Sequence, residues 1–129
     1  MLGLDFKNRI AYLCEVTTHL DGLLYGSSNT ATIKRIRNKY AHMQEYADNY
    51  LPHYLTHRKF MFWSPVVRYT ARKGLEEING LELVINDNYA DCVSKLREFA
   101  TKVTYDTGNP TMRVLQILGH LRREKATNS

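Results

Sequence analysis

Hydrophobic residues in the first part of the chain recur at helical spacing. Between Asp5 and Leu24 most of them are separated by three or four positions, which is the period of an amphipathic helix. We therefore expect a first helix over residues 5–24. Its apolar positions are Ile10, Leu13, Cys14, Leu20, Leu23 and Leu24.

A second helix is predicted after a loop of glycine, serine and asparagine. Asn29 or Thr30 can cap its first turn, because a side-chain oxygen there accepts a backbone N–H that lacks a partner within the helix. The apolar positions again step by three and four, and this pattern continues toward Tyr50. The helix should end there, because Pro52 disfavours the helical conformation in the residue before it.

Two segments in the middle of the chain are harder to assign. Residues 53–63 combine aromatic and basic side chains, and their periodicity does not distinguish a helix from an extended segment. Pro65 can occupy the first turn of a third helix, with Ser64 as its cap. Residues 81–85 alternate as in a strand, but a single short strand would lack a partner.

The last third of the chain predicts helices again. Asp87 or Asn88 can cap one helix, and residues 112–121 form a last amphipathic helix, followed by a tail that we expect to be frayed from about residue 125. The predicted fold is therefore all-α, a single compact bundle of four to five helices in one domain over residues 1–129.

Composition excludes several classes of protein. The 129 residues are 43% hydrophobic and 24% charged, as in one ordinary folded domain. No apolar stretch approaches the roughly 20 residues of a membrane span, and the N-terminus lacks a signal-peptide pattern, so we expect a cytoplasmic protein without a membrane partner. Cys14 and Cys92 lack the spacing of a disulfide framework or thiolate metal site. The net charge of +5 permits an anionic partner.

One segment of the second helix combines residue types that carry chemistry. Arg37 precedes His42 with four residues between them. Asn38 and His42 share a helix face, so the amide can orient the imidazole. A histidine transfers protons near neutral pH and an arginine matches phosphate oxygens, a combination suited to phosphodiester cleavage. The spacing alone is weak evidence, because ten arginines and five histidines give about 0.4 such pairs by chance.

Basic residues around this motif predict contact with RNA. Lys34, Arg35 and Lys39 can attract a phosphate backbone by releasing counterions, although a solvent-exposed helix face is the simpler interpretation. The aromatic residues among positions 54–63 can stack on bases, or pack in the core or a dimer interface. His53 and His57 have the spacing of two metal ligands on a helix, but no third ligand accompanies them, so we predict no metal and no cofactor.

The string from Thr32 to His42 resembles the signature of HEPN domains, in which an arginine is followed by four to six residues, the first of them polar, and then a histidine. The segment from Phe6 to Leu13 is similar to the helix that precedes this motif in HEPN-like relatives of the mannitol operon repressor. The resemblance covers roughly the first third of the chain.

The resemblance implies a dimeric all-α protein that acts as a metal-independent endoribonuclease, a toxin or phage-defence effector. Arg37 and His42 of two protomers would then meet at the dimer interface, with an antitoxin or regulatory protein as a further partner. His42 would transfer the proton of a ribose 2′-hydroxyl, Arg37 would stabilise the developing charge and Asn38 would hold the site in shape. The alternatives are a non-catalytic helical regulator or interaction module, like the mannitol operon repressor, and an RNA-binding protein without cleavage.

Overall fold

The computed structural model describes residues 1–23, 25–51, 57–105 and 107–127, and from residue 122 only the backbone. Within these residues there are four helices and one four-stranded sheet, so the predicted all-α bundle is wrong. The chain forms two compact units, Met1–Tyr89 and Ala90–Ser129, and each is described by itself.

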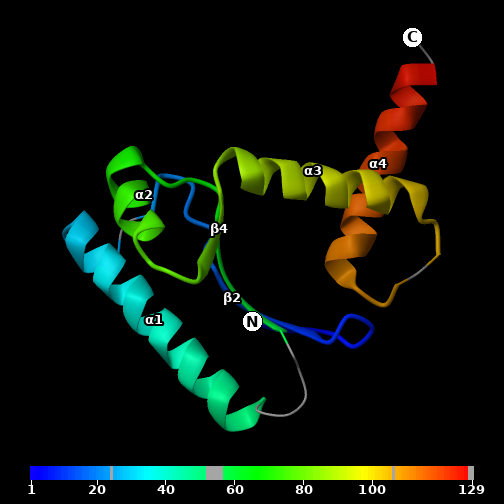
Figure 1. The fold of residues 1–129 in the computed structure, drawn as a ribbon. Helices are drawn as coiled ribbons and strands as arrows, with labels where there is room; N and C mark the ends of the chain where they lie inside the picture. The colour runs from blue at the N-terminus through cyan, green and yellow to red at the C-terminus, as the bar shows by residue number, and fades with distance from the viewer. Residues whose placement is uncertain (24, 52–56, 106, 128–129) are drawn as a thin grey trace. The chain divides into compact units, whose positions relative to one another are not determined.

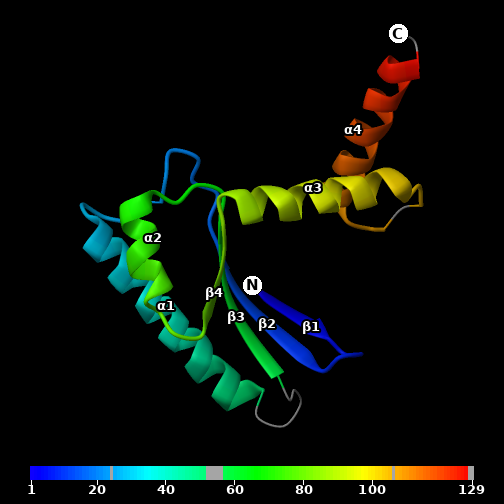
Figure 2. The same ribbon diagram turned by 45° about the horizontal axis from the view of Figure 1, so that its top comes forward.

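The first unit contains the whole sheet. The strand order is β1-β2-β3-β4, with β1 and β2 antiparallel and the other neighbours parallel. Helices α1 and α2 connect the parallel strands, and Figures 1 and 2 show both of them on the same face of the sheet. The elements are β1 (Leu2–Asp5), β2 (Ile10–Val16), α1 (Asn29–Tyr50), β3 (His57–Ser64), α2 (Tyr69–Glu76) and β4 (Leu81–Ile85).

The predicted first helix over residues 5–24 is also wrong, because this segment begins with a β-hairpin. Its turn is closed by Asp5, whose carboxylate accepts hydrogen bonds from the backbone N–H and the side-chain amide of Asn8, at 3.0 and 2.7 Å. These bonds hold the pKa of Asp5 below its usual range. In β2, Ala11 and Leu13 are buried, as expected for alternate residues that face the helices.

Helix α1 confirms the predicted second helix. It begins one or two residues earlier than predicted, because Ser28 and not Asn29 or Thr30 is the N-cap, and its hydroxyl accepts the N–H of Ala31 at 3.1 Å. The helix runs to Tyr50, the predicted end. Of its buried positions, Ile36 and Ala47 pack with residues of the sheet, whereas the hydroxyl of Thr32 accepts the N–H of Tyr25 in the preceding loop at 2.8 Å.

The remaining elements of the first unit explain the ambiguous segments. Residues 57–64 form the strand β3, whereas residues 53–56 lie outside the described part of the chain. Residues 81–85 form the strand β4, and β3 is the partner that the sequence analysis did not find for it. Helix α2 begins at Tyr69 rather than at Pro65, because the side chain of Asn86 bonds the N–H and the C=O of Val67, at 2.7 and 3.0 Å, and holds the preceding segment extended.

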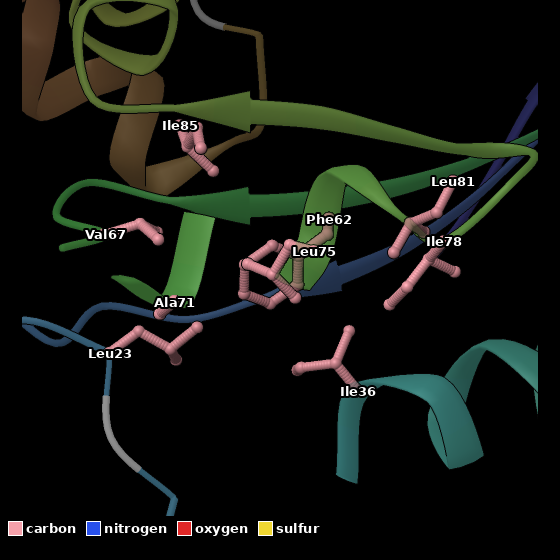
Figure 3. Packing of buried hydrophobic residues seen from close by; sticks show 9 residues of the cluster. All are labelled: Leu23, Ile36, Phe62, Val67, Ala71, Leu75, Ile78, Leu81 and Ile85. Carbon is pink, nitrogen blue, oxygen red and sulfur yellow. The ribbon is translucent and has the colours of Figure 1, made fainter. Parts of the chain in front are cut away.

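The core of the first unit lies between the sheet and its two helices. Figure 3 shows Phe62 of β3, Ile36 of α1 and Leu75 of α2 pointing into this space. The two helices approach closely, because a Cβ added to Gly74 would lie 2.1 Å from the Cδ1 atom of Ile33. Helix α1 is therefore held against both the sheet and α2.

The second unit contains helix α4 (Pro110–Thr127) and all but the first three residues of helix α3 (Asp87–Lys102). These are the two helices predicted for the last third of the chain. The buried amide of Gln116 donates to the carbonyls of Val103 and Tyr105, at 2.8 and 3.0 Å, and so fixes the connecting loop. The backbone of α4 is helical to Thr127, and the rest of the predicted frayed tail lies outside the described residues. None of the described helices is long and apolar enough to cross a membrane.

Candidate nucleic-acid interface

The two main residues of the predicted catalytic motif lie on different flanks of α1. The guanidinium of Arg37 lies 3.5 Å from the carboxylate of Glu77, at the end of α2. His42 is exposed and lines a hollow at the opposite flank, together with residues of β1 and β2. Five positions along a helix correspond to a rotation of about 140°. Within one chain, the fold therefore does not bring Arg37 and His42 together.

Asn38 lies beside Arg37 and apart from the hollow that His42 lines. It lines a shallow hollow of about 340 Å³ on the outer side of α1, together with Lys34 and Arg37. Among the residues that the structure describes, no hydrogen bond joins Asn38 to His42. The predicted role of Asn38 in orienting the imidazole thus stays a prediction.

A different set of side chains forms a row along the flank of α1 that faces β1 and β2. These residues are spaced by four, three, four and four positions, which keeps them on one side of the helix. Over the described residues they extend for about 22 Å along the helix axis. We call this row the α1 stripe: Arg35, Lys39, His42, Tyr46 and Tyr50.

The first part of the stripe is basic and packs against a tyrosine. The guanidinium carbon of Arg35 and the ammonium of Lys39 lie 4.9 and 5.4 Å from the centre of the Tyr25 ring. His19 meets the same ring edge-on at 5.7 Å. Cation–π contacts hold a cation in place while leaving hydrogen-bond donors free for phosphate oxygens. The predicted RNA-binding residues Arg35 and Lys39 are thus brought together, whereas Lys34 lies on the outer side of the helix.

Lys39 and Arg35 differ in their acidic partners. Lys39 forms an ion pair with Glu15 of β2, and this contact holds the first part of the stripe against the sheet. In the described part of the chain, Arg35 has no carboxylate partner. Its guanidinium is therefore available to an external anion.

The middle of the stripe borders a hollow of about 290 Å³ between α1 and the first two strands. The hollow has apolar walls, and its side-chain polar groups are the imidazole of His42, the carboxylate of Glu15 and the hydroxyl of Tyr46. An open site with few polar groups on apolar walls is typical of small-ligand sites. The lining residues are Met1, Leu2, Leu13, Cys14, Glu15, His42, Met43 and Tyr46.

The last part of the stripe is aromatic and exposed. Tyr46 is 45% exposed and Tyr50 is 70% exposed, although large aromatic side chains are usually buried in a fold of this size. Their ring centres lie 4.8 Å apart with an angle of 35° between the planes. The stripe therefore ends in a tilted pair of tyrosines whose exposed ring faces can take a further flat group.

The carboxyl ends of the parallel strands, where α/β proteins commonly bind ligands, are used for packing in this chain. The buried hydroxyl of Thr17 donates to the hydroxyl of Ser64 at 3.1 Å. The side chain of Asn86 accepts the N–H of Val67 and donates to its C=O. Thr17, Ser64 and Asn86, at the ends of β2, β3 and β4, thus bond to other groups of the protein, so the candidate site is placed on the α1 stripe instead.

The structure gives little support to the two other sites considered from the sequence, the aromatic segment and the pair of possible metal ligands. Phe60 packs against the core and Phe62 lies within it, which agrees with the packing interpretation of the aromatic segment. His57 is exposed on β3, while His53 and Tyr54 lie outside the described residues. Within the described part, no group of three or more histidine, cysteine or acidic side chains is placed to hold a metal ion.

Sequence reasoning missed four residues of this surface: Glu15, Tyr25, Tyr46 and Tyr50. The spacing from Arg35 to Tyr50 was visible in the sequence, because it follows one flank of a predicted helix. Glu15 and Tyr25 were not, because the segment that contains them was predicted as a helix or a loop.

No protein-family model, curated protein or solved structure matches this chain. The resemblance to HEPN domains therefore rests on the sequence alone. The segment from Phe6 to Leu13, which resembled a helix of that family, forms a turn and the start of β2, and the all-helical bundle that the resemblance implied is not the fold found. The homodimer and the antitoxin or regulatory partner stay predictions.

Proposed function

We propose that the protein binds single-stranded nucleic acid, and RNA in particular, along the α1 stripe. The observation that carries this proposal is the alignment of two cations, a histidine and two exposed tyrosines on one flank of α1. Proteins that bind single strands combine a basic groove for the backbone with aromatic rings on which bases stack. The cytoplasmic location expected from the sequence fits such a protein and stays a prediction.

The basic part of the stripe suits the phosphates. From Asn29 to Gln44 the helix carries four basic residues and no acidic one. Arg35 presents a planar set of donors that matches a phosphate in two places. Lys34 extends the positive charge onto the outer side of the helix.

The aromatic part suits unpaired bases rather than a duplex. Bases in a duplex hide their faces in the stack, whereas a single strand offers them to Tyr46 and Tyr50. RNA is the expected form, because the imidazole of His42 can pair with the 2′-hydroxyl that distinguishes RNA from DNA.

Reversing the charge of Arg35 tests the proposal. In fluorescence anisotropy with a labelled oligouridine, we expect Arg35→Glu to weaken binding about tenfold and to flatten the slope of log K against log salt concentration by roughly 1. The native protein should show a slope of about −2 to −3 if three or four phosphates are contacted. A DNA oligonucleotide of the same length tests the preference for RNA.

The matched control is Lys73→Glu on α2. Lys73 is also an exposed helical cation stacked on a tyrosine, with its ammonium 4.8 Å from the centre of the Tyr69 ring, but it lies outside the stripe. If both variants lose the same affinity, binding depends on total charge and the stripe has no special role. Salt-independent binding, or no binding by the native protein, would contradict the proposal itself.

Cleavage of the bound RNA is a second candidate function. It is favoured by the exposure of His42 in the hollow beside the proposed RNA path, where an imidazole can take a proton from a 2′-hydroxyl. Because Arg37 lies on the opposite flank, the composite site implied by the HEPN resemblance needs the Arg37 of a second copy.

We expect any cleavage to persist in excess EDTA and to be lost in both His42→Ala and Arg37→Ala. Mixing the two inactive variants should restore part of the activity, because a mixed dimer would contain one intact composite site. Gel analysis of labelled RNA, beside circular dichroism of each variant, measures this. Binding without cleavage by the native protein would leave the non-catalytic RNA-binding function.

A further inference from the structure

The hollow beside His42 is lined by polar groups that differ in hydrogen-bonding character, among them the carboxylate of Glu15. Resting on the proposed function, we infer that this hollow holds one unstacked base that carries an exocyclic amino group, and that it prefers cytosine to uracil. The carboxylate of Glu15 is the group that makes the choice.

Glu15 is placed to accept a hydrogen bond from a base. Its side chain is 24% exposed and lines the hollow. One of its oxygens, Oε1, accepts a hydrogen bond from the ammonium of Lys39, which fixes the carboxylate. The lone pairs of the other oxygen, Oε2, are then left to accept a hydrogen bond from a ligand. Because an ionised carboxylate only accepts hydrogen bonds, it favours a donor on the base edge.

Cytosine and uracil differ at the position that Glu15 would contact. Cytosine presents an amino donor at C4, whereas uracil presents a carbonyl acceptor there. Carboxylates pair with the amino group of cytosine in base recognition. A uracil carbonyl against the same carboxylate would leave two acceptors facing each other without a proton, which is costly in a partly desolvated site.

The walls of the hollow suit a flat ring. Leu13 and Met43 provide apolar surface, and Tyr46 stands at the rim with its ring partly exposed. An unstacked base is commonly held between aromatic or apolar side chains while its edge is hydrogen-bonded. The volume of about 290 Å³ lies near the lower end of the range for small-ligand pockets, as expected for one base rather than a whole dinucleotide.

Lys39 connects the hollow to the basic end of the stripe. Lys39 forms an ion pair with Glu15 and also contacts the ring of Tyr25. The guanidinium of Arg35 contacts the same ring. His42 follows Lys39 by one helical turn, a rise of about 5 Å. A backbone bound at Arg35 can therefore place a neighbouring base in the hollow without leaving the helix flank.

Binding of oligocytidine and oligouridine of equal length, measured by fluorescence anisotropy at neutral pH, tests the inference. We expect the native protein to bind oligocytidine about tenfold more tightly, as for one hydrogen bond to a charged group. In Glu15→Gln the ratio should fall to within about twofold, because the amide can donate to uracil as well as accept from cytosine. The quantity to compare is the ratio of the two affinities, for oligocytidine and for oligouridine. The substitution also releases Lys39 from its ion pair, which changes both affinities by the same factor and leaves their ratio unaffected.

Glu82→Gln is the matched control, because Glu82 also forms an ion pair with a lysine, Lys59, at 3.7 Å, but outside the hollow. It should keep the tenfold ratio, and thermal unfolding should show that both variants are folded. Salt-dependent binding of both oligonucleotides with equal affinity would overturn this inference and leave the proposed function standing. A preference that survives in Glu15→Gln would overturn the role of Glu15, and a native protein that binds neither would overturn both proposals.

Discussion

Replacing Phe62 by alanine should lower the free energy of unfolding of the first unit by about 3–5 kcal/mol. The side chain of Phe62 is fully buried, with 0% of its surface exposed, and lies on β3 among residues of both helices. Removing the ring loses its transfer free energy and leaves a cavity that strands held in register on both sides cannot close. The effect approaches the whole stability of many small domains.

Urea unfolding followed by tryptophan fluorescence measures this change. The chain has one tryptophan, Trp63, which is next to Phe62 on β3 and therefore reports on the first unit. Phe6→Ala is the control, because it removes the same ring from a side chain that is 65% exposed. If the two variants unfold at the same urea concentration, Phe62 is not at the centre of the core.

The element that sequence analysis predicted best is α1, because its signals are local. The serine and asparagine before it, the helical period and the proline after it all act within a few residues of the helix ends. The error at the cap, Ser28 instead of Asn29 or Thr30, is of the size expected for helix ends.

The strands were missed because their signals are not local. In β2 the buried Ala11 and Leu13 alternate with Tyr12 and Cys14, which are only partly exposed, so both faces contain apolar residues and a helical spacing can be drawn through them. The parallel partner of β2 is β3, which lies more than 40 residues later in the sequence. The strand pattern of residues 81–85 was rejected for want of a partner, and that partner was the segment left unassigned.

The candidate site was only partly predictable for the same reason. Arg35, Lys39 and His42 were recognised because they belong to α1, and their common flank follows from the helical period. Arg37 was grouped with His42 because of the HEPN resemblance, which implies that the two residues meet between two copies of the chain. Within one chain they lie on different flanks of α1. Tyr46 and Tyr50 were not singled out, because tyrosines on a helix often pack inside a protein, and the sequence does not show that these two are exposed.

Replacing Tyr46 by alanine should weaken the binding of single-stranded RNA by about 1–3 kcal/mol, or roughly 5–150-fold in Kd. Tyr46 borders the hollow and also contacts the ring of Tyr50, so its removal takes away both the stacking surface and the support of its neighbour. Because stacking does not depend on charge, the salt dependence of binding should stay unchanged, in contrast to Arg35→Glu.

Tyr69→Ala provides the comparison that isolates this effect. Tyr69 is 68% exposed, close to the value for Tyr50, and its ring contacts Lys73 instead of a second tyrosine, but it lies on α2 outside the stripe. The fluorescence anisotropy titration used for Arg35→Glu should give native affinity for Tyr69→Ala and a large loss for Tyr46→Ala. Equal losses would show that any exposed tyrosine on this protein contributes to binding. No loss in either would mean that the bases do not stack on the stripe, and the proposed contact would then reduce to the phosphates held by its basic end.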